Sequence, residues 1–280
     1  MISIDERASS VARLSEASAS APATKQSTVI APQSPASEQI LALSLIGRRE
    51  VAERTLEFRF PRPAGMTFRA GQFMDLTLLD PSETDAEGNT RGFSINGAPD
   101  EADLIFTTRL RDTAFKRVLR SMPLGTGVKI DGPFGNFTLH NDEKRPAILL
   151  AGGIGITPFR SIVRRAVHAK LRHQIILFYA NHRPEDAPFL DEFVRFERLN
   201  PNFIFVPTMT RMEDSHVPWS GETGRLDGGM ILRHVRRTNP QVAAIYYIAG
   251  PPRMVAGLHQ VLKTIGIDDD DIRMEDFAGY

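Results

Sequence analysis

The sequence contains no cysteine. This absence excludes disulfide frameworks, thiolate zinc sites, cysteine-ligated iron–sulfur clusters and cysteine nucleophiles together. Net charge is absent too, because 34 basic residues balance 34 acidic ones, so no bulk field would attract nucleic acid or an anionic membrane. Every uncharged stretch, residues 147–159 among them, is shorter than the roughly 18 to 20 apolar residues of a membrane helix. We therefore expect a soluble, cytoplasmic protein that binds no nucleic acid and inserts into no membrane.

The chain is long enough for two domains of ordinary size, with 280 residues of which 41% are apolar and 24% charged. Residues 1–37 are dominated by Ser, Ala and Pro, which predicts a disordered tail. The seven histidines show no metal-ligand spacing, so we expect no metal site. The sequence leaves the oligomeric state open.

Residues 38–140 are rich in short alternating segments separated by turn clusters, the pattern of antiparallel strands. One helical stretch, residues 114–121, interrupts them. Six such strands predict a small Greek-key β-barrel. The candidate strands are residues 40–49, 55–60, 72–79, 92–96, 104–111 and 128–130.

Residues 141–280 alternate between apolar runs and amphipathic helices, which is typical of a doubly wound α/β domain. The runs are continuously apolar because both faces of a parallel sheet are covered. The candidate strands are residues 147–151, 175–180, 203–207 and 245–249, and the candidate helices are residues 158–170, 188–199, 229–236 and 252–265.

A glycine-rich loop, AGGIGITP, follows the first of these strands and opens a helix. Its glycines are Gly152, Gly153 and Gly155. Thr157 and Pro158 suit the N-cap and the first helical position, and the helix N-terminus would favour a pyrophosphate. Pro158 stands where the usual dinucleotide fingerprint has a third glycine, and the second strand ends in Asn181 rather than an acid. The loop predicts a nucleotide site other than an ordinary NAD Rossmann site; tight helix–strand packing is the alternative interpretation.

A second junction of strand, glycine and helix lies at residues 246–254, with the sequence YYIAGPPRM. Gly250, Pro251 and Met254 belong to it. Two strand ends that face one crevice predict a ligand at the carboxyl edge of the sheet. A helix that merely begins at proline is the alternative.

Five motifs in this order resemble the ferredoxin-NADP reductase family, whose members join an FAD-binding barrel to an NAD(P)-binding α/β domain. They are RGFS at 91–94, GPFGNF at 132–137, GGIGITP at 152–158, AGPPRM at 249–254 and EDFAGY at 275–280. The resemblance covers residues 40–280.

The resemblance implies a flavin site in the barrel, centred on the RGFS motif with Gly92. Arg91 suits the FAD pyrophosphate, Phe93 would offer a ring to the isoalloxazine where the family commonly has Tyr, and Ser94 would meet the reacting edge near N5. Thr113 resembles the family position that binds flavin phosphate.

The resemblance also implies where hydride transfer occurs. Thr157 resembles the threonine between flavin and nicotinamide, and Ala249 replaces the family cysteine nearby. Glu275, Phe277 and Tyr280 resemble the terminal segment that lies against the flavin, and which of the two rings stacks on it is left open.

Coenzyme choice depends on the segment after the third parallel strand. Thr210 and Arg211 resemble the Ser-Arg pair that holds the 2′-phosphate of NADPH. Glu213 and Asp214 could instead accept from the ribose hydroxyls of NADH. We expect NADPH slightly ahead of NADH.

The resulting hypothesis is an FAD-dependent NAD(P)H oxidoreductase that passes hydride to flavin N5 and then electrons to a separate acceptor, such as ferredoxin or flavodoxin. A chain without cysteine carries no [2Fe–2S] domain of its own. Two alternatives are a reductase of free flavin, ferric chelates or quinones, and a non-catalytic flavin-binding redox sensor. Lys116, Arg117 and Arg120 form either a docking patch for an acidic carrier or a solvated helix face.

Overall fold

The computed structural model describes residues 41–236, 238 and 242–277. The predicted tail, residues 1–37, and Tyr280 lie outside the described residues. The first half is built from antiparallel strands in two sheets, ordered β1-β7-β4-β5 and β2-β3-β6. Their bounds are β1 Leu41–Ser44, β2 Gly47–Ala52, β3 Thr55–Pro61, β4 Phe73–Leu78, β5 Thr90–Ser94, β6 Asp103–Arg109 and β7 Gly127–Phe134, with helix α1 at Ala114–Ser121.

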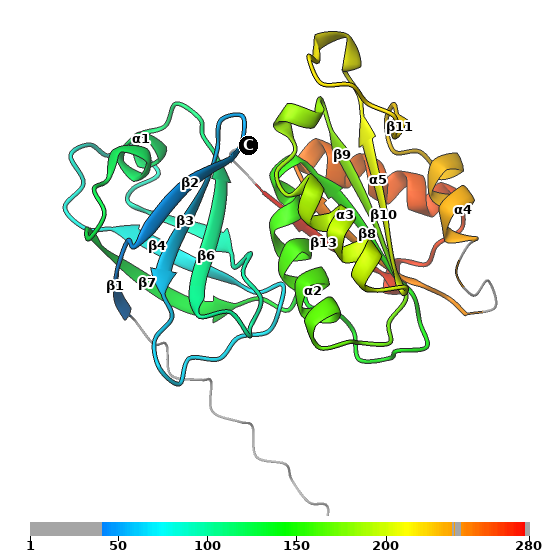
Figure 1. The fold of residues 1–280 in the computed structure, drawn as a ribbon, viewed down its shortest axis with the longest axis horizontal. Coiled ribbons are helices and arrows are strands. Elements are labelled where there is room, and N and C mark those ends of the chain that lie inside the picture. The colour runs from blue at the N-terminus through cyan, green and yellow to red at the C-terminus, as the bar shows by residue number, and fades with distance from the viewer. Residues whose placement is uncertain (1–40, 237, 239–241, 278–280) are drawn as a thin grey trace, which may run out of the picture. The chain divides into compact units, whose positions relative to one another are not determined.

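The two sheets enclose one apolar core, as the barrel prediction requires (Figure 1). In β4 every second side chain points inward, because side chains alternate between the two faces of a strand. Met74, Leu76 and Leu78 are thus buried. Phe115 and Leu119 of α1 pack into the same core.

The predicted strand 40–49 is wrong in one respect, since it is two strands. The chain changes sheet at Leu45 and Ile46: Leu45 N donates to Thr126 O beside β7, whereas Ile46 N donates to Arg59 O in β3. Leu45 is fully buried at this corner. Backbone pairing with distant strands therefore divides a stretch whose hydrophobic pattern is continuous.

The second half is a six-stranded parallel sheet, ordered β11-β10-β9-β8-β12-β13, with helices on both faces (Figure 1). The elements are β8 Ala147–Gly152, α2 Ile156–His168, β9 Ile175–Asn181, α3 Leu190–Leu199, β10 Phe203–Met209, β11 Glu222–Thr223, α4 Gly228–Val235, β12 Ile245–Gly250, α5 Pro252–Thr264 and β13 Ile272–Asp276. The doubly wound prediction is confirmed. The sequence patterns had not indicated the two-residue strand β11.

Side chains of successive residues in the central strand β8 point to opposite faces of the sheet. Leu149 packs with the helices α2 and α3, whereas Ile148 and Leu150 pack with α4 and α5. Burial on both faces explains why these strands read as continuous apolar runs. The predicted boundary at residue 140 falls between β7 and β8.

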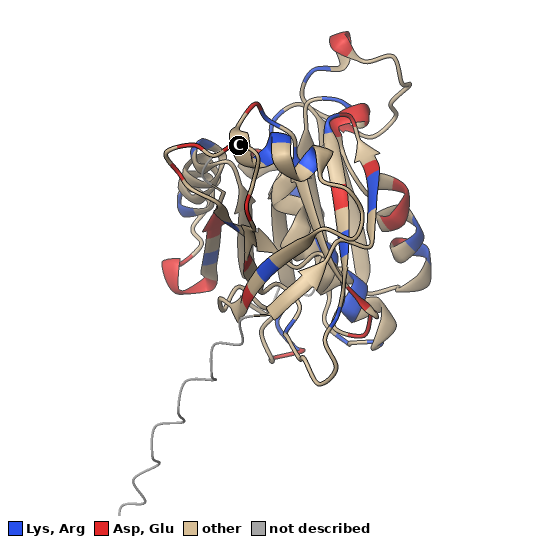
Figure 2. Ribbon diagram, turned by 90° about the vertical axis from the view of Figure 1, so that its left-hand side faces the viewer, with Lys and Arg blue, Asp and Glu red and all other residues tan. Residues whose placement is uncertain are grey.

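Charged residues of both signs occur across the face drawn in Figure 2. Among the helices of the described ranges, none combines the length and apolar character that a membrane span requires.

Candidate functional site: two pockets joined by the last strand pair

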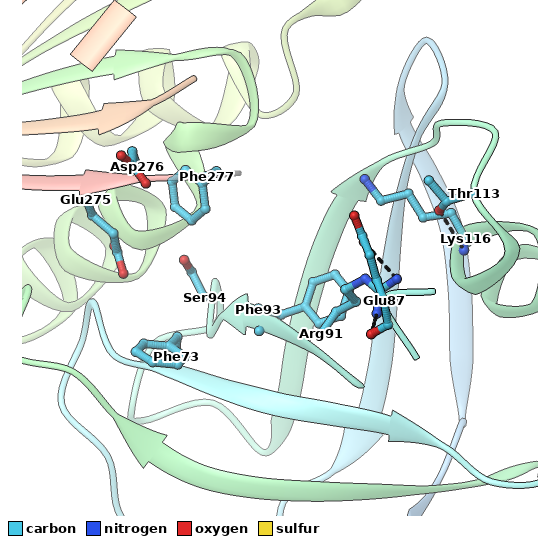
Figure 3. A pocket seen from close by; sticks show the side chains of 11 residues that line it. Phe73, Glu87, Arg91, Phe93, Ser94, Thr113, Lys116, Glu275, Asp276 and Phe277 are labelled. Carbon is cyan, nitrogen blue, oxygen red and sulfur yellow. Dashed lines mark hydrogen bonds and ion pairs between the residues drawn. The ribbon is translucent and has the colours of Figure 1, made fainter. Parts of the chain in front are cut away.

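A cavity of about 470 Å³ lies between the barrel and the end of β13 (Figure 3). All five residues that the sequence assigned to the flavin site of the barrel line it, and they come from β5 and from the start of α1. These are Arg91, Gly92, Phe93, Ser94 and Thr113.

Arg91 lies at one end of this cavity, where its position is fixed by several bonds. Its Nη1 donates to the carbonyl oxygens of Glu87, Gly88 and Thr90 at 3.0, 2.9 and 2.8 Å. Its Nη2 pairs with Asp85 Oδ1 at 3.0 Å. The guanidinium thus organises the loop before β5 and remains in the pocket lining.

Lys116 adds a second positive charge at the same end. The hypotheses that it belongs to a docking patch or to a solvated helix face are wrong, because it is only 8% exposed and lines the pocket. Its Nζ donates to Arg109 O at 3.0 Å. Burial, followed by the charges of Arg111 and Arg91, lowers the pKa of Lys116 to about 8.

The other two cations of the predicted patch lie outside the pocket. Arg117 pairs with Glu83 at 2.6 Å, and Arg120 is exposed. Thr113 caps α1, since its hydroxyl accepts from Lys116 N. A helix N-terminus and two cations therefore converge at this end, which suits a diphosphate.

Two aromatic rings, of Phe73 and Phe277, and two polar groups line the opposite end, whereas Phe93 lies beside Arg91 (Figure 3). Phe93 is only 5% exposed, and its ring packs against Phe106 and Phe115 in the barrel core. Its main observed contact is therefore core packing. Phe73, which the sequence analysis missed, and Phe277 also line the cavity.

Ser94 and Glu275 point toward the same part of this end in Figure 3. Ser94 Oγ and Glu275 Oε2 are buried without a hydrogen-bond partner among the described residues. Burial raises the pKa of Glu275 from its ordinary value near 4.5 to about 7. Buried polar atoms usually have partners, so these two are free to bond a ligand atom. The pocket thus fits FAD, with cations for the diphosphate and rings and polar groups for the flavin.

The raised pKa of Glu275 predicts a pH-dependent stability. Below about pH 4.5 the carboxyl is protonated in both folded and unfolded chains, whereas above pH 7 the folded state must hold a buried charge. The free energy of unfolding should therefore fall as the pH rises from about 4.5 to about 7, by up to about 3 kcal/mol at 1.36 kcal/mol per pKa unit, and level off above that range. In thermal unfolding of the flavin-free protein, Glu275→Gln should match the native chain near pH 4 and exceed it at pH 8. Equal melting curves at pH 8 would contradict this.

A second cavity, of about 820 Å³, lies at the carboxyl ends of the parallel strands. Six of the predicted coenzyme residues line it: Gly152, Gly153, Thr210, Arg211, Pro251 and Met254. The alternative set for NADH, Glu213 and Asp214, does not line it.

The glycines of the two junctions have different roles. Gly153 has φ +52° and open space where a Cβ would stand, so its backbone is free to approach a ligand. A Cβ on Gly155 would lie 2.2 Å from Ala249 O, so this glycine permits the 3₁₀ turn to pack closely against the end of β12. A Cβ on Gly152 would overlap the sulfur of Met254.

Four predicted residues line neither cavity: Gly155, Thr157, Pro158 and Gly250. Thr157 is 3% exposed, and its hydroxyl donates to Ile154 O at 3.0 Å. Helix α2 begins at Ile156 with Gly155 as its N-cap, so the N-cap and first-position predictions for Thr157 and Pro158 are wrong. The short 3₁₀ turn Gly153–Gly155 starts the helical path earlier than the proline suggested.

Sequence reasoning missed several polar residues of the second cavity, namely Arg109, His182, Arg225 and Arg253. Arg253 lies inside the AGPPRM motif and was open to detection there. Arg109 belongs to β6 of the barrel, so only the fold brings it to this cavity.

The described residues form a β-barrel followed by a parallel α/β sheet, with one cavity beside the barrel and a second at the carboxyl ends of the parallel strands. The family model "Oxidoreductase NAD-binding domain" matches residues 149–260. This match covers less than half of the chain.

Several known proteins are similar to it. One component of the Na⁺-translocating NADH-quinone reductase of Methylococcus capsulatus is 30% identical over 55% of this chain and 38% of its own length. The reductase component of propane 2-monooxygenase of Rhodococcus jostii is 26% identical over 77% of this chain and 57% of its own. The chain thus spans about half the length of these relatives. A ferredoxin NADP⁺ reductase of Neisseria gonorrhoeae, solved with bound FAD and NADP, shares the fold with a TM-score of 0.70 at 22% identity, over 85% of this chain and 98% of that one.

Proposed function

We propose that the chain is an FAD-dependent NAD(P)H oxidoreductase that delivers electrons to a separate acceptor. The observation that carries this proposal is the strand pair that joins the two pockets. Glu275 of the flavin pocket is in register with Ala249 of β12, and Phe277 N donates to Gly250 O at 3.1 Å, directly before Pro251 of the coenzyme pocket. The nicotinamide end of a dinucleotide bound in the second pocket would reach the flavin pocket by lying along this strand pair.

Bound FAD would supply the chemistry, since it accepts hydride from a reduced nicotinamide and releases electrons singly. The residues of the chain would bind and orient. Arg91 and Lys116 would hold the diphosphate, with Thr113 and Gly92 beside them. Ser94 would donate to the flavin edge, Phe93 or Phe73 would contact the ring, and Glu275 would hold a proton near it at neutral pH.

Phe277 would cover the exposed face of the flavin, and the nicotinamide would displace its ring to reach that face. Gly152 and Gly153 would receive the coenzyme pyrophosphate, with Pro251 and Met254 forming the opposite wall. Thr157 and Pro158 would act indirectly, by building the first turn of the helix behind the glycine loop.

The acceptor would be a small redox protein such as ferredoxin or flavodoxin. These 280 residues contain no cysteine and hold no iron–sulfur cluster through thiolates, so a next carrier of that kind would lie outside them. The similarity to a protein named as a reductase component supports this choice.

The test is the visible spectrum of the purified chain with FAD, recorded before and after anaerobic addition of NADPH or NADH. We expect a bound-flavin spectrum that bleaches with coenzyme and recovers when ferredoxin or flavodoxin is added. Quinones, ferric chelates and free flavin serve as competing acceptors. A chain that binds no FAD overturns the proposal, and a flavin that coenzyme leaves oxidised supports a sensor instead.

Coenzyme preference gives a separate prediction. Thr210 and Arg211 line a cavity with three further arginines, and no carboxylate of the described residues is paired with Arg211. We expect NADPH to be preferred, with Arg211→Ala weakening NADP⁺ binding about 10 to 150 fold, the equivalent of roughly 1.5 to 3 kcal/mol for a charged hydrogen bond. NAD⁺ binding should change less than about threefold. Calorimetric titration measures both affinities. Arg172→Ala, exposed and outside the cavity, is the control, and equal losses for both coenzymes would remove Arg211 from the phosphate site.

A further inference from the structure

Helix α2 and the segment after β5 are joined by two buried hydrogen bonds. Arg160 Nη1 donates to Asn96 O at 2.7 Å, and Ser161 Oγ donates to Gly97 O at 2.6 Å. Arg160 is 2% exposed and Ser161 is fully buried. Neither residue lines a pocket, so neither would touch a cofactor.

The position of these bonds connects the two pockets. Asn96 follows Ser94 of the flavin pocket by two residues, and Arg160 follows Thr157 by about one helical turn. The path from the flavin-side strand to the start of the nicotinamide-side helix is therefore short, and the side chains of Arg160 and Ser161 on it are buried.

Arg160 is itself held from two further sides. Its Nε and Nη2 donate to the two oxygens of Glu192 on α3, at 2.8 and 3.1 Å. Its guanidinium lies over the ring of Phe189, 4.6 Å from the centroid. A planar guanidinium bonded at both ends has one orientation, which a flexible ammonium would not share.

The network extends to the other end of the same segment. Arg164 pairs with Glu192 at 2.7 Å and with Glu101 at 3.0 Å, and Glu101 Oε2 accepts from Ala98 N at 2.6 Å. The segment 96–101 is thus bonded to α2 at several points. These bonds fix the distance between segment 96–101 and α2, because breaking any of them leaves a buried charge or carbonyl without a partner.

We propose that Arg160 and Ser161 are positioning residues that set the spacing between the flavin and the nicotinamide. The inference rests on the proposed function. Hydride transfer needs reacting atoms about 3 to 3.5 Å apart, and a displacement of about 1 Å can cost on the order of 100 fold in rate. Loosening these bonds should therefore slow the transfer while leaving each cofactor bound.

The experiment uses the full chain with FAD and compares Arg160→Met, Arg160→Lys and Ser161→Ala. The limiting rate of flavin reduction at saturating NADPH should fall about 10 to 100 fold in Arg160→Met and about 3 to 10 fold in Ser161→Ala. Arg160→Lys keeps a donor for Asn96 O and should recover part of the loss. FAD content and the Kd for NADP⁺ should stay within about threefold of the native values.

Two readouts besides rate separate positioning from general damage. The long-wavelength absorbance of nicotinamide stacked on flavin should weaken in the variants. Hydrogen exchange should quicken in residues 94–98 and 156–161 only. Asp100→Asn is the matched control, because it removes the 2.7 Å pair with His168 between the same segment and the far end of the same helix, and it should leave the limiting rate unchanged.

If Arg160→Met does not fold, Arg160→Lys and Ser161→Ala decide the question. Native limiting rates in both would overturn the proposal, as would a rate loss that only follows loss of FAD. A native chain that binds no flavin or resists reduction by coenzyme would instead remove the proposed function.

Discussion

Among glycine-to-alanine substitutions at the two glycine junctions, Gly155→Ala should destabilise the parallel-sheet half of the chain most. The added Cβ would lie 2.2 Å from Ala249 O and 2.6 Å from Gly250 Cα, and both are backbone atoms of the neighbouring strand end. Backbone cannot rotate away as a side chain can, so the 3₁₀ turn before α2 must move away from the end of β12. We expect a loss of about 3 kcal/mol, the upper part of the usual range for overpacking. For a unit of this size the melting temperature should fall by roughly 6 to 12 °C.

Gly257→Ala is the matched control. This glycine is exposed within α5, and no atom lies within 4 Å of the site of its Cβ. Replacing a helix-interior glycine by alanine should gain about 0.5 to 1 kcal/mol. Thermal unfolding followed by circular dichroism compares both variants. Similar melting temperatures for the two would mean that the junction tolerates displacement.

Arg91→Ala should release FAD. The substitution removes a charged donor from the diphosphate end of the pocket, which costs about 1.5 to 3 kcal/mol, or roughly 10 to 150 fold in Kd. It also removes three bonds to carbonyls of the loop before β5, so the pocket rim loses its order. We therefore expect a loss near 100 fold, measured by quenching of flavin fluorescence on titration with the chain.

Glu87→Gln separates the two contributions. Glu87 is 72% exposed and pairs with Arg91 at 2.9 Å, so its neutralisation spares the carbonyl bonds and removes a negative charge from the rim. FAD should bind as tightly as to the native chain, or more tightly. Native-like affinity in Arg91→Ala would place the diphosphate elsewhere, and a loss in Glu87→Gln equal to that in Arg91→Ala would assign the effect to the rim.

The order of the barrel and the parallel sheet could be predicted, because the hydrophobic pattern of a strand differs when one face or both faces are covered. In the structure, buried and partly buried side chains alternate along β4, and every residue of β8 is buried. The corner at Leu45 could not be predicted, because the choice between two partner strands depends on Thr126 and Arg59, far away in sequence. The start of α2 was misplaced because proline is tolerated anywhere in a first turn.

The site could be predicted where a motif follows a strand directly, as Arg91 and Gly153 do. Lys116 could not, because a pattern treats a lysine on a short helix as solvent-facing, although its stem can pass through apolar surface. Arg109 could not, because a barrel residue meets the coenzyme pocket only through the packing of the two domains.

If the barrel binds FAD as proposed, the inward direction of Lys116 would link flavin supply to the amount of folded protein. Without a bound anion, this buried ammonium and the nearby guanidinium of Arg91 repel each other, which is part of why its proton is held weakly. A diphosphate that binds only the folded barrel relieves that repulsion and shifts the folding equilibrium by mass action. Chains made when flavin is scarce would therefore spend more time unfolded and be degraded sooner. Under the proposed function, the half-life of the polypeptide would then depend on how much flavin is available.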